Sequence, residues 1–322
     1  MKENIMIIGA LGQIGTELTV ALQGIYGESH VVATDIVEKR NLPQQFKGQY
    51  EHLNVQDKEN IGAIIDKYKI TQIYNLAAIL SAKGEQNPLF AWRLNMEGLL
   101  NVLGLIVERG SNIKHFWPSS IAAFGPTTPR HNTPQFTVME PTTAYGISKQ
   151  AGERWAEYYW LSKQVDTRSL RYPGLISYKA MPGGGTTDYA VDIFHKAILN
   201  GGYECFLNPG TFLPMMYMSD AVRATLEIMH ADADKIKIRS SYNLAGVSFD
   251  PEGLSAEIRQ HIPDFRIWYK PDFRQQIADS WPASIDDTNA QQDWGWKLEY
   301  DLPKMTKDMI VELKKKLITK SL

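Results

Sequence analysis

The chain has few cysteines and histidines and a small net charge. Its single cysteine, Cys205, cannot form an intramolecular disulfide. Without a neighbouring base or positive helix start, Cys205 is expected to be a small buried apolar residue. The seven histidines include no pair at the helical spacing of metal ligands, so we predict no metal site. A formal net charge of −2 argues against a general nucleic-acid-binding protein.

Long apolar runs are also scarce. No run approaches the roughly 20 residues that cross a bilayer, which predicts no membrane partner. A strand-like run begins within the first residues and leaves no room for a signal peptide, so we expect a cytoplasmic protein. With 322 residues, 43% of them hydrophobic and 22% charged, the chain can form one large or two modest globular domains.

A glycine-rich turn near the N-terminus predicts a dinucleotide site. The apolar run Ile5–Ile8 indicates a buried strand that leads into Gly9-x-x-Gly12-x-x-Gly15 and a helical pattern. Glycines in such a turn let the backbone approach a pyrophosphate, and the helix N-terminus faces its charge. The next strand-like run ends at Asp35, where a carboxylate would bind the adenosine ribose and disfavour a 2′-phosphate. The spacing departs from Gly-x-Gly-x-x-Gly, but all parts fall in register and favour NAD.

Tyr145 and Lys149 suggest the chemistry that would use this dinucleotide. Four residues apart in a helical pattern, they share one helix face. An ammonium beside a phenol favours the phenolate, which can take a proton from an alcohol. We therefore expect Lys149 to lower the pKa of Tyr145 from its usual value near ~10. The spacing also occurs on ordinary helix faces, but beside a dinucleotide site it predicts alcohol oxidation.

Alternating strand and helix patterns fill the first half of the chain. Strands are expected near residues 52–55, 72–78, 113–117 and 167–172, and helices near 61–68, 90–108 and 145–161. This order predicts an α/β fold with a doubly wound parallel sheet, which binds ligands beyond the carboxyl ends of its strands. The residues expected to contact the cofactor are Gly9, Leu11, Gly12, Gln13, Ile14, Gly15, Asp35, Asn54, Val55, Leu76, Ala77, Ala78, Tyr145, Lys149 and Tyr172.

The alternation stops after Tyr172. A glycine-rich loop over 181–189 precedes an expected N-capped helix starting at 218 and a strand near 242–245. We expect residues 1–174 to form an NAD-binding domain, with about 214–247 returning to it. Residues 175–213 and 248–322 would then form a substrate-binding lobe, with the substrate in the cleft between the two parts.

Together, these motifs resemble a known family. The glycine turn, Asp35, Leu76-Ala77-Ala78, Ser119-Ser120 and Tyr145-x-x-x-Lys149 resemble the extended short-chain dehydrogenases, which include the nucleotide-sugar epimerases. Long strings over 169–179, 185–190, 213–218 and 280–282 are similar to the short-chain L-threonine 3-dehydrogenases within that family. The resemblance implies NAD-dependent oxidation of the β-hydroxyl of L-threonine to 2-amino-3-oxobutyrate.

The resemblance also implies roles for individual residues. Tyr145 would be the base, Lys149 would hold the ribose and lower the tyrosine pKa, and Ser120 would bind the reacting oxygen. Ser119 is the neighbouring alternative, because either serine could face the site. The substrate residues are expected to be Ser81, Ser120, Tyr145, Thr186, Thr187 and Trp281. Asp188 could meet the substrate ammonium, or it could cap a helix.

The sequence also suggests an oligomeric state and two alternative functions. Relatives pair through the helices near 90–108 and 145–161, so we expect a homodimer. Two alternatives stay open: a nucleotide-sugar epimerase or dehydratase that retains NAD, and a non-catalytic NAD-sensing regulator.

Overall fold

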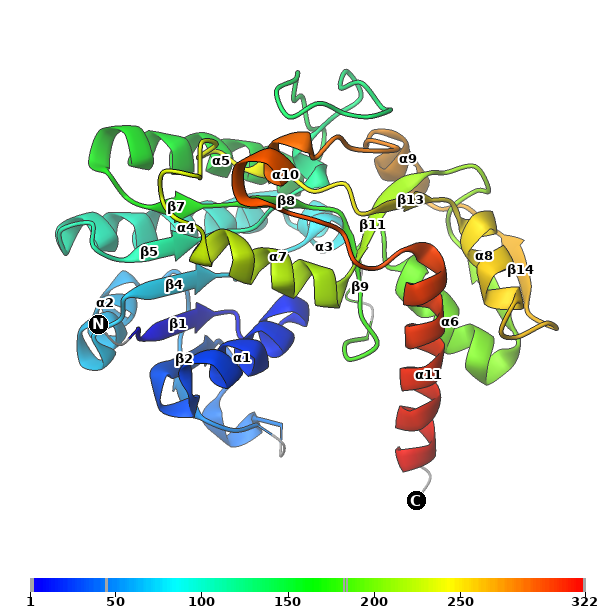
Figure 1. Cartoon of the computed structure of the whole chain (residues 1–322), viewed down its shortest axis with the longest axis horizontal. Helices are drawn as coiled ribbons and strands as arrows, with labels where there is room; N and C mark the ends of the chain where they lie inside the picture. The colour runs from blue at the N-terminus through cyan, green and yellow to red at the C-terminus, as the bar shows by residue number, and fades with distance from the viewer. Residues whose placement is uncertain (1–2, 44–45, 182, 184, 321–322) are drawn as a thin grey trace.

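The computed structural model describes residues 3–43, 46–181, 183 and 185–320 (Figure 1). Pro182 and Gly184 of the predicted glycine-rich loop lie outside the described residues.

A six-stranded parallel sheet forms the centre of the N-terminal half. Its strands run in the order β3-β2-β1-β4-β5-β7, and every neighbouring pair is parallel. The bounds are β1 (Ile5–Ile8), β2 (Val31–Asp35), β3 (Gln49–His52), β4 (Gln72–Asn75), β5 (Lys114–Phe116) and β7 (Thr167–Arg168). The predicted doubly wound sheet is confirmed. Because the strand order reverses between β1 and β4, a ligand crevice opens beyond the ends of these two strands.

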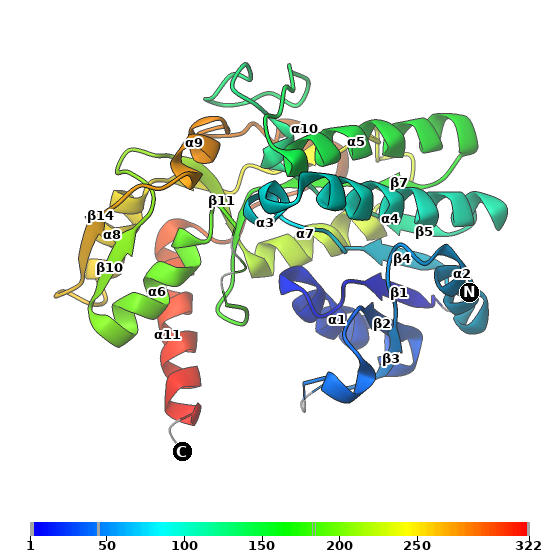
Figure 2. The same cartoon turned by 180° about the vertical axis from the view of Figure 1, so that it is seen from behind.

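Helices cover both faces of this sheet. Helices α1 (Gln13–Tyr26) and α7 (Met218–His230) lie on one face, which is nearer the viewer in Figure 1. The other face, seen in Figure 2, carries α2 (Lys58–Tyr68), α4 (Pro88–Glu108) and α5 (Ala144–Lys163). Strand β1 is buried on both sides because alternate side chains point to opposite faces. Ile5 and Ile7 join one apolar core, and Met6 and Ile8 join the other.

Two expected strands differ in their bounds, and one expected helix differs in its cap. Strand β3 ends at His52 rather than starting there, because Leu53 and Val55 turn into the core beneath α4. The expected sixth strand is two strands, since β7 pairs with β5 whereas β8 (Leu170–Tyr172) pairs with β6 (Ser119–Ser120). Helix α7 does start at Met218, but its N-cap is Tyr217, which makes no side-chain capping bond.

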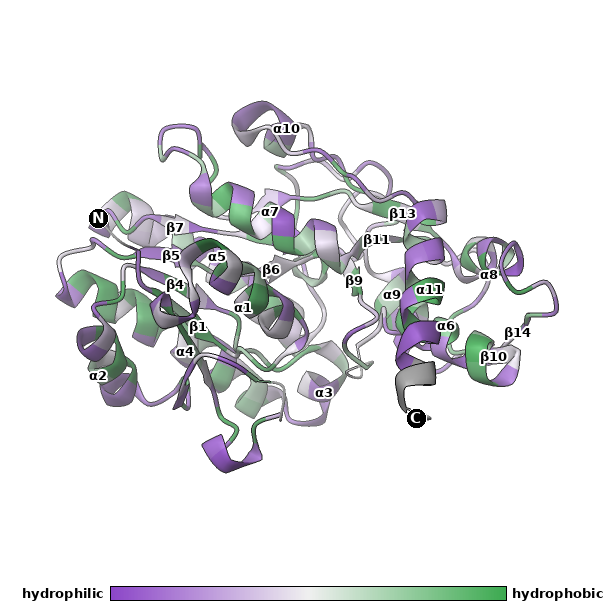
Figure 3. Ribbon diagram, turned by 60° about the horizontal axis from the view of Figure 1, so that its bottom comes forward, coloured by the Kyte–Doolittle hydropathy of each residue, from purple (hydrophilic) through white to green (hydrophobic). Residues whose placement is uncertain are grey.

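The second half adds small sheets and helices beside the main sheet. The remaining strands are β9 (Gly174–Ile176), β10 (Gly202–Cys205), β11 (Leu213–Tyr217), β12 (Tyr242–Asn243), β13 (Val247–Phe249) and β14 (Arg266–Tyr269). The helices are α3 (Ser81–Gln86), α6 (Tyr189–Asn200), α8 (Pro251–Arg259), α9 (Arg274–Asp279), α10 (Thr288–Trp294) and α11 (Leu302–Lys320). Polar and apolar residues alternate along α11 (Figure 3), and its Met305, Met309 and Leu313 are buried. The proposed division into domain and lobe stays a prediction.

Helix α4 corrects the expectation about apolar runs. Its 21 residues are long and apolar enough, by length and composition alone, to cross a membrane, and it is the one such helix in the described part of the chain. Half of its most apolar window is buried inside the protein, and core helices pass the same test. Leu99, Val102 and Leu103 pack in the core shared with the sheet. Helix α4 is therefore weak evidence for a membrane span.

Candidate functional site

A cleft opens where the crevice beyond β1 and β4 meets the second half of the chain. It is lined by the glycine turn, the ends of β4 and β8, the start of α5, the segment before α6, and Trp281. The predicted residues on its wall are Gly9, Gly12, Gln13, Ile14, Gly15, Leu76, Ala78, Ser81, Ser119, Ser120, Tyr145, Lys149, Tyr172, Thr186, Thr187 and Trp281. Segments distant in sequence therefore meet at one site.

The glycine turn requires glycine for physical reasons. Gly9 has a φ of +81°, and a Cβ there would lie 2.9 Å from the backbone nitrogen of Ala77. A Cβ on Gly15 would lie 2.3 Å from the carbonyl oxygen of Gly9. Gly12 precedes α1 and has no side chain to cap it, so the first N–H groups of the helix face the cleft. This cradle fits a pyrophosphate.

Asp35 lies at the end of β2, beside the glycine turn. Its Oδ2 accepts a hydrogen bond of 3.0 Å from the backbone N–H of Leu11, which fixes the carboxylate next to the turn. Five of the predicted cofactor residues do not line the cleft itself, namely Leu11, Asp35, Asn54, Val55 and Ala77. Asp35 and Asn54 nevertheless follow neighbouring strands at the same sheet edge, where the adenosine end of a dinucleotide would extend.

Tyr145 and Lys149 lie on one face of α5 in a nearly closed environment. Tyr145 is 9% exposed and Lys149 is 2% exposed. The Lys149 ammonium lies 5.4 Å from the centre of the Tyr145 ring and 4.3 Å from that of Trp117. It donates a hydrogen bond of 2.5 Å to the carbonyl oxygen of Pro118. The Ser120 hydroxyl lies next to Tyr145 and acts to lower the pKa of its phenol. One end of the cleft thus combines a phenol, an ammonium and a hydroxyl.

The pKa of Tyr145 is raised by burial, whereas we expected Lys149 to lower it. Burial raises the pKa of Tyr145 to about 12, although the Ser120 hydrogen bond opposes the rise. Burial also lowers the pKa of Lys149 to about 7, against the opposing charge of Glu153. Removal from water disfavours both charged forms, and this effect outweighs the attraction of an ammonium for a phenolate. The predicted lowering of the tyrosine pKa is therefore wrong for the chain by itself.

The two adjacent serines point in different directions. Ser120 faces Tyr145, and its hydroxyl also accepts a bond of 3.2 Å from the N–H of Ala122. Ser119 is buried, and its hydroxyl donates a bond of 2.6 Å to Glu153. Both serines line the cleft, but the Ser119 hydroxyl turns to the interior, because successive residues of a strand face opposite sides.

Four other predicted residues line the cleft, namely Ser81, Thr186, Thr187 and Trp281. Ser81 starts α3, and Trp281 is 5% exposed. Thr186 is 1% exposed, and its hydroxyl has no hydrogen-bond partner among the residues that the structure describes. A buried, unsatisfied hydroxyl is costly unless a ligand completes it. Asp188 precedes α6 and accepts a bond of 2.7 Å from the N–H of Gly185.

Some lining residues and a buried network were not predicted. Leu80, Pro118, Ile121, Pro173, Gly174, Leu175 and Gly185 also line the cleft. Pro173 and Gly174 directly follow β8, so their place at a strand end was the available signal. The sequence gives no signal for a buried Glu153, because a glutamate on a helix usually faces solvent. Within the described ranges, no group of three or more His, Cys, Asp or Glu residues could hold a metal ion.

Comparisons with known proteins agree with this geometry. The model of the "NAD dependent epimerase/dehydratase family" matches residues 5–245. An uncharacterized epimerase/dehydratase of Staphylococcus saprophyticus is 48% identical over 309 residues, 96% of each chain. A solved "GalE-like L-Threonine dehydrogenase" from Cupriavidus necator in its holo form is 55% identical, with a TM-score of 0.94 over 96% of this chain and 99% of the other.

A further solved structure is described as a monomeric L-threonine 3-dehydrogenase from a metagenome, in its apo form. It is 48% identical, with a TM-score of 0.92 over 97% of this chain and 99% of the other. Family match, fold and glycine cradle all imply a nicotinamide dinucleotide as cofactor. The chain belongs to the NAD dependent epimerase/dehydratase family.

Proposed function

We propose that this protein oxidises the β-hydroxyl of L-threonine to 2-amino-3-oxobutyrate with NAD as hydride acceptor. The observation that carries the proposal is the meeting of Tyr145, Lys149 and Ser120 with the glycine cradle in one cleft. The similarity to solved L-threonine dehydrogenases supports the choice of alcohol.

In the proposed reaction, Tyr145 acts as a phenolate: it takes the proton of the substrate hydroxyl and becomes a neutral phenol. Ser120, which lines the cleft next to Tyr145, would hold the reacting oxygen beside it. Lys149 would bind the ribose hydroxyls and offer a positive charge 5.4 Å from the phenol ring. Bound NAD would accept the hydride from the carbinol carbon, and its cationic ring would favour the phenolate that burial opposes.

Substrate threonine also carries an ammonium and a carboxylate. We assign their binding to Ser81, Thr186 and Thr187, with Trp281 closing the far side. Thr186 supports this assignment most directly, because its buried hydroxyl lines the cleft and lacks a partner among the described residues. Asp188 occupies the N-cap position of α6 but makes no side-chain capping bond; its carboxylate accepts a bond from the N–H of Gly185 instead.

We also propose that NAD is preferred over NADP. A 2′-phosphate near the Asp35 carboxylate would meet a like charge, and Asp35 is held in place by Leu11. Replacement of Asp35 by Ser should weaken NAD binding about tenfold or more. It should also reduce the ratio of the affinity for NAD to the affinity for NADP. Titrating both cofactors against both proteins measures this change.

One experiment separates the candidate functions. The protein is mixed with NAD and either L-threonine or a uridine sugar, and NADH is followed by absorbance. Our proposal predicts NADH with threonine only. Conversion of the uridine sugar without net NADH would support the epimerase alternative, which the names of the curated relatives favour. NAD binding without any turnover would indicate a sensing regulator.

A further inference from the structure

Glu153 extends the helix face that holds Tyr145 and Lys149. The three residues are spaced by four along α5, so they follow one another on the same side of the helix. Glu153 is 0% exposed, although a carboxylate in the interior requires a partner of opposite charge. This burial sets it apart from Glu157, the other glutamate of the helix, which is partly exposed.

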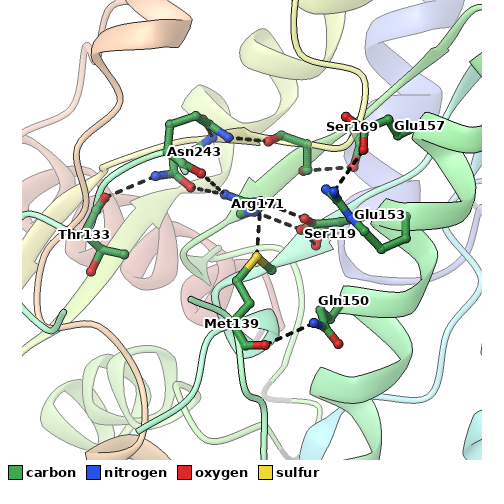
Figure 4. Close-up of polar contacts among 12 residues, drawn as sticks. Ser119, Thr133, Met139, Gln150, Glu153, Glu157, Ser169, Arg171 and Asn243 are labelled. Atoms are coloured by element: carbon green, nitrogen blue, oxygen red, sulfur yellow. Dashed lines mark hydrogen bonds and ion pairs between the residues drawn. The ribbon is translucent and has the colours of Figure 1, made fainter. Parts of the chain in front are cut away.

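Arg171 of β8 supplies the opposite charge. Its Nε and Nη2 donate bonds of 2.9 and 2.7 Å to the two carboxylate oxygens of Glu153 (Figure 4). A two-point bond of this kind fixes both distance and orientation. The remaining amino group of Arg171 donates to the carbonyl of Gln135 and to Oδ1 of Asn243, each at 2.9 Å. The pair is therefore satisfied by a wider buried network.

Ser119 connects this pair to the strand that carries Ser120. Its hydroxyl donates to Glu153 Oε1 at 2.6 Å. In the sheet, Ser119 pairs with Arg171 and Ser120 pairs with Tyr172. Pro118, whose carbonyl holds the Lys149 ammonium, directly precedes Ser119. The carboxylate of Glu153 thus binds segment 118–120 through the Ser119 hydroxyl. The Pro118 carbonyl and Ser120 of the same segment lie beside Lys149 and Tyr145.

Helix α5 packs so closely beside segment 118–120 that small shifts of this segment would change the geometry of the site. A Cβ on Gly146 would lie 2.2 Å from the carbonyl oxygen of Ala122, and one on Gly152 would lie 2.3 Å from the Trp117 ring. Helix α5 therefore touches the chain on both sides of segment 118–120. With contact this close, a small shift of the strand end moves Ser120 relative to Tyr145.

The hydrogen-bond network also extends toward the side of the cleft that Trp281 lines. Asn243 donates through Nδ2 to the carbonyls of Thr133 and Asp286, at 3.2 and 3.1 Å. Residues near Thr133 are bonded to the chain just after Trp281, since the N–H of Ala283 donates to the carbonyl of Arg130 at 2.7 Å. The same buried contacts therefore join α5 to the segment that carries Trp281.

We propose that Glu153 is a positioning residue for the reaction. Through Ser119 and Arg171, it fixes segment 118–120 against α5, so that Ser120 and the Pro118 carbonyl meet Tyr145 and Lys149 in working geometry. The inference rests on the proposed function of this site. It also gives Ser119 a role through Glu153 rather than on the substrate.

Ser119→Ala is the mildest test, because it removes one hydroxyl and leaves the ion pair intact. Ser255→Ala is the matched control, since Ser255 is a 0% exposed serine of α8 whose hydroxyl accepts one bond from Arg259. Both variants should lose similar thermal stability. Only Ser119→Ala should lower kcat, by about tenfold, with KM for threonine changed less than about twofold. A folded Ser119→Ala protein with wild-type kcat would overturn the proposal.

Glu153→Gln tests the carboxylate itself. It preserves shape but leaves the buried guanidinium of Arg171 without a counter-charge, so kcat should fall by about a hundredfold or more. If this variant does not fold, Ser119→Ala decides the question alone.

A cofactor titration separates this proposal from the proposed function. If the unchanged protein does not oxidise threonine, the proposed function fails. NADH binding then tests the positioning role, because Lys149 would still hold the ribose. Ser119→Ala should weaken NADH binding at least about threefold by fluorescence titration, and Ser255→Ala should not. Equal affinities in both variants and the unchanged protein would overturn the positioning role under that condition.

Discussion

The replacement of Tyr145 by Phe removes a single oxygen from the centre of the proposed chemistry. Tyr145 is 9% exposed, so the ring of the variant would fill the same space without a new cavity. Loss of one buried hydroxyl should change the free energy of unfolding by no more than about 1.5 kcal/mol. Loss of the proton acceptor should lower kcat by about 10²–10⁴-fold. NADH binding should change by less than about threefold, because the ribose contact is assigned to Lys149.

The assay follows NADH formed from L-threonine and NAD, with a parallel NADH titration and thermal melt. Tyr158→Phe is the matched control, because it removes a phenol oxygen from an exposed position on the same helix. It should leave kcat unchanged. A Tyr145→Phe protein that binds NADH and keeps more than about a tenth of the wild-type kcat would refute the assignment of Tyr145 as base.

Three further predictions follow from burial and shape. The lowered pKa of Lys149, about 7, means that the unfolded chain binds more protons than the folded one between pH about 7 and 10. Over that window the free energy of unfolding should therefore rise with pH relative to Lys149→Met, by at most about 1.4 kcal/mol per pH unit; equal slopes in denaturant titrations would contradict this. Gly9→Ala should destabilise the protein by about 1–3 kcal/mol and weaken NAD binding, because its Cβ would meet Ala77 at a φ of +81°. Gly24→Ala should instead stabilise α1 by about 0.5–1 kcal/mol, since nothing lies within 4 Å of the added Cβ; similar effects of the two changes on melting would refute the reasoning. The proposed homodimer should sediment with the mass of two chains, and a charge in place of Trp155, which is 40% exposed on α5, should release monomers; a wild-type monomer, as one solved relative is described, would contradict it.

Patterns that follow from local chemistry could be predicted from the sequence. Four buried apolar residues running into Gly9 and Gly12 specify a strand, a tight turn and a helix without reference to the rest of the chain. The helix of Tyr145 and Lys149 follows in the same way from its spacing, and Thr143 caps it with a bond of 3.0 Å to the N–H of Gly146.

Features set by distant partners could not be predicted. The expected sixth strand divides at Ser169 because Thr167–Arg168 pairs with β5 and Leu170–Tyr172 pairs with β6 and β12. Leu53 and Val55 resemble strand residues in sequence, yet tertiary packing beneath α4 uses them in a turn.

The site shows the same limit. The pKa values of Tyr145 and Lys149 depend on how much water the whole fold removes, which their spacing does not contain. Likewise, the burial of Glu153 on helix α5 depends on Arg171, eighteen positions later on strand β8.

The transfer of hydrogen from Cβ of threonine tests the central proposal most directly. L-threonine carrying deuterium at Cβ would be incubated with the protein and NAD, and the reduced cofactor analysed by mass spectrometry. We predict one deuterium in each NADH formed, because the hydride leaves the carbon that bears the hydroxyl as Tyr145 takes the hydroxyl proton. NADH without deuterium, or no NADH at all, would contradict it.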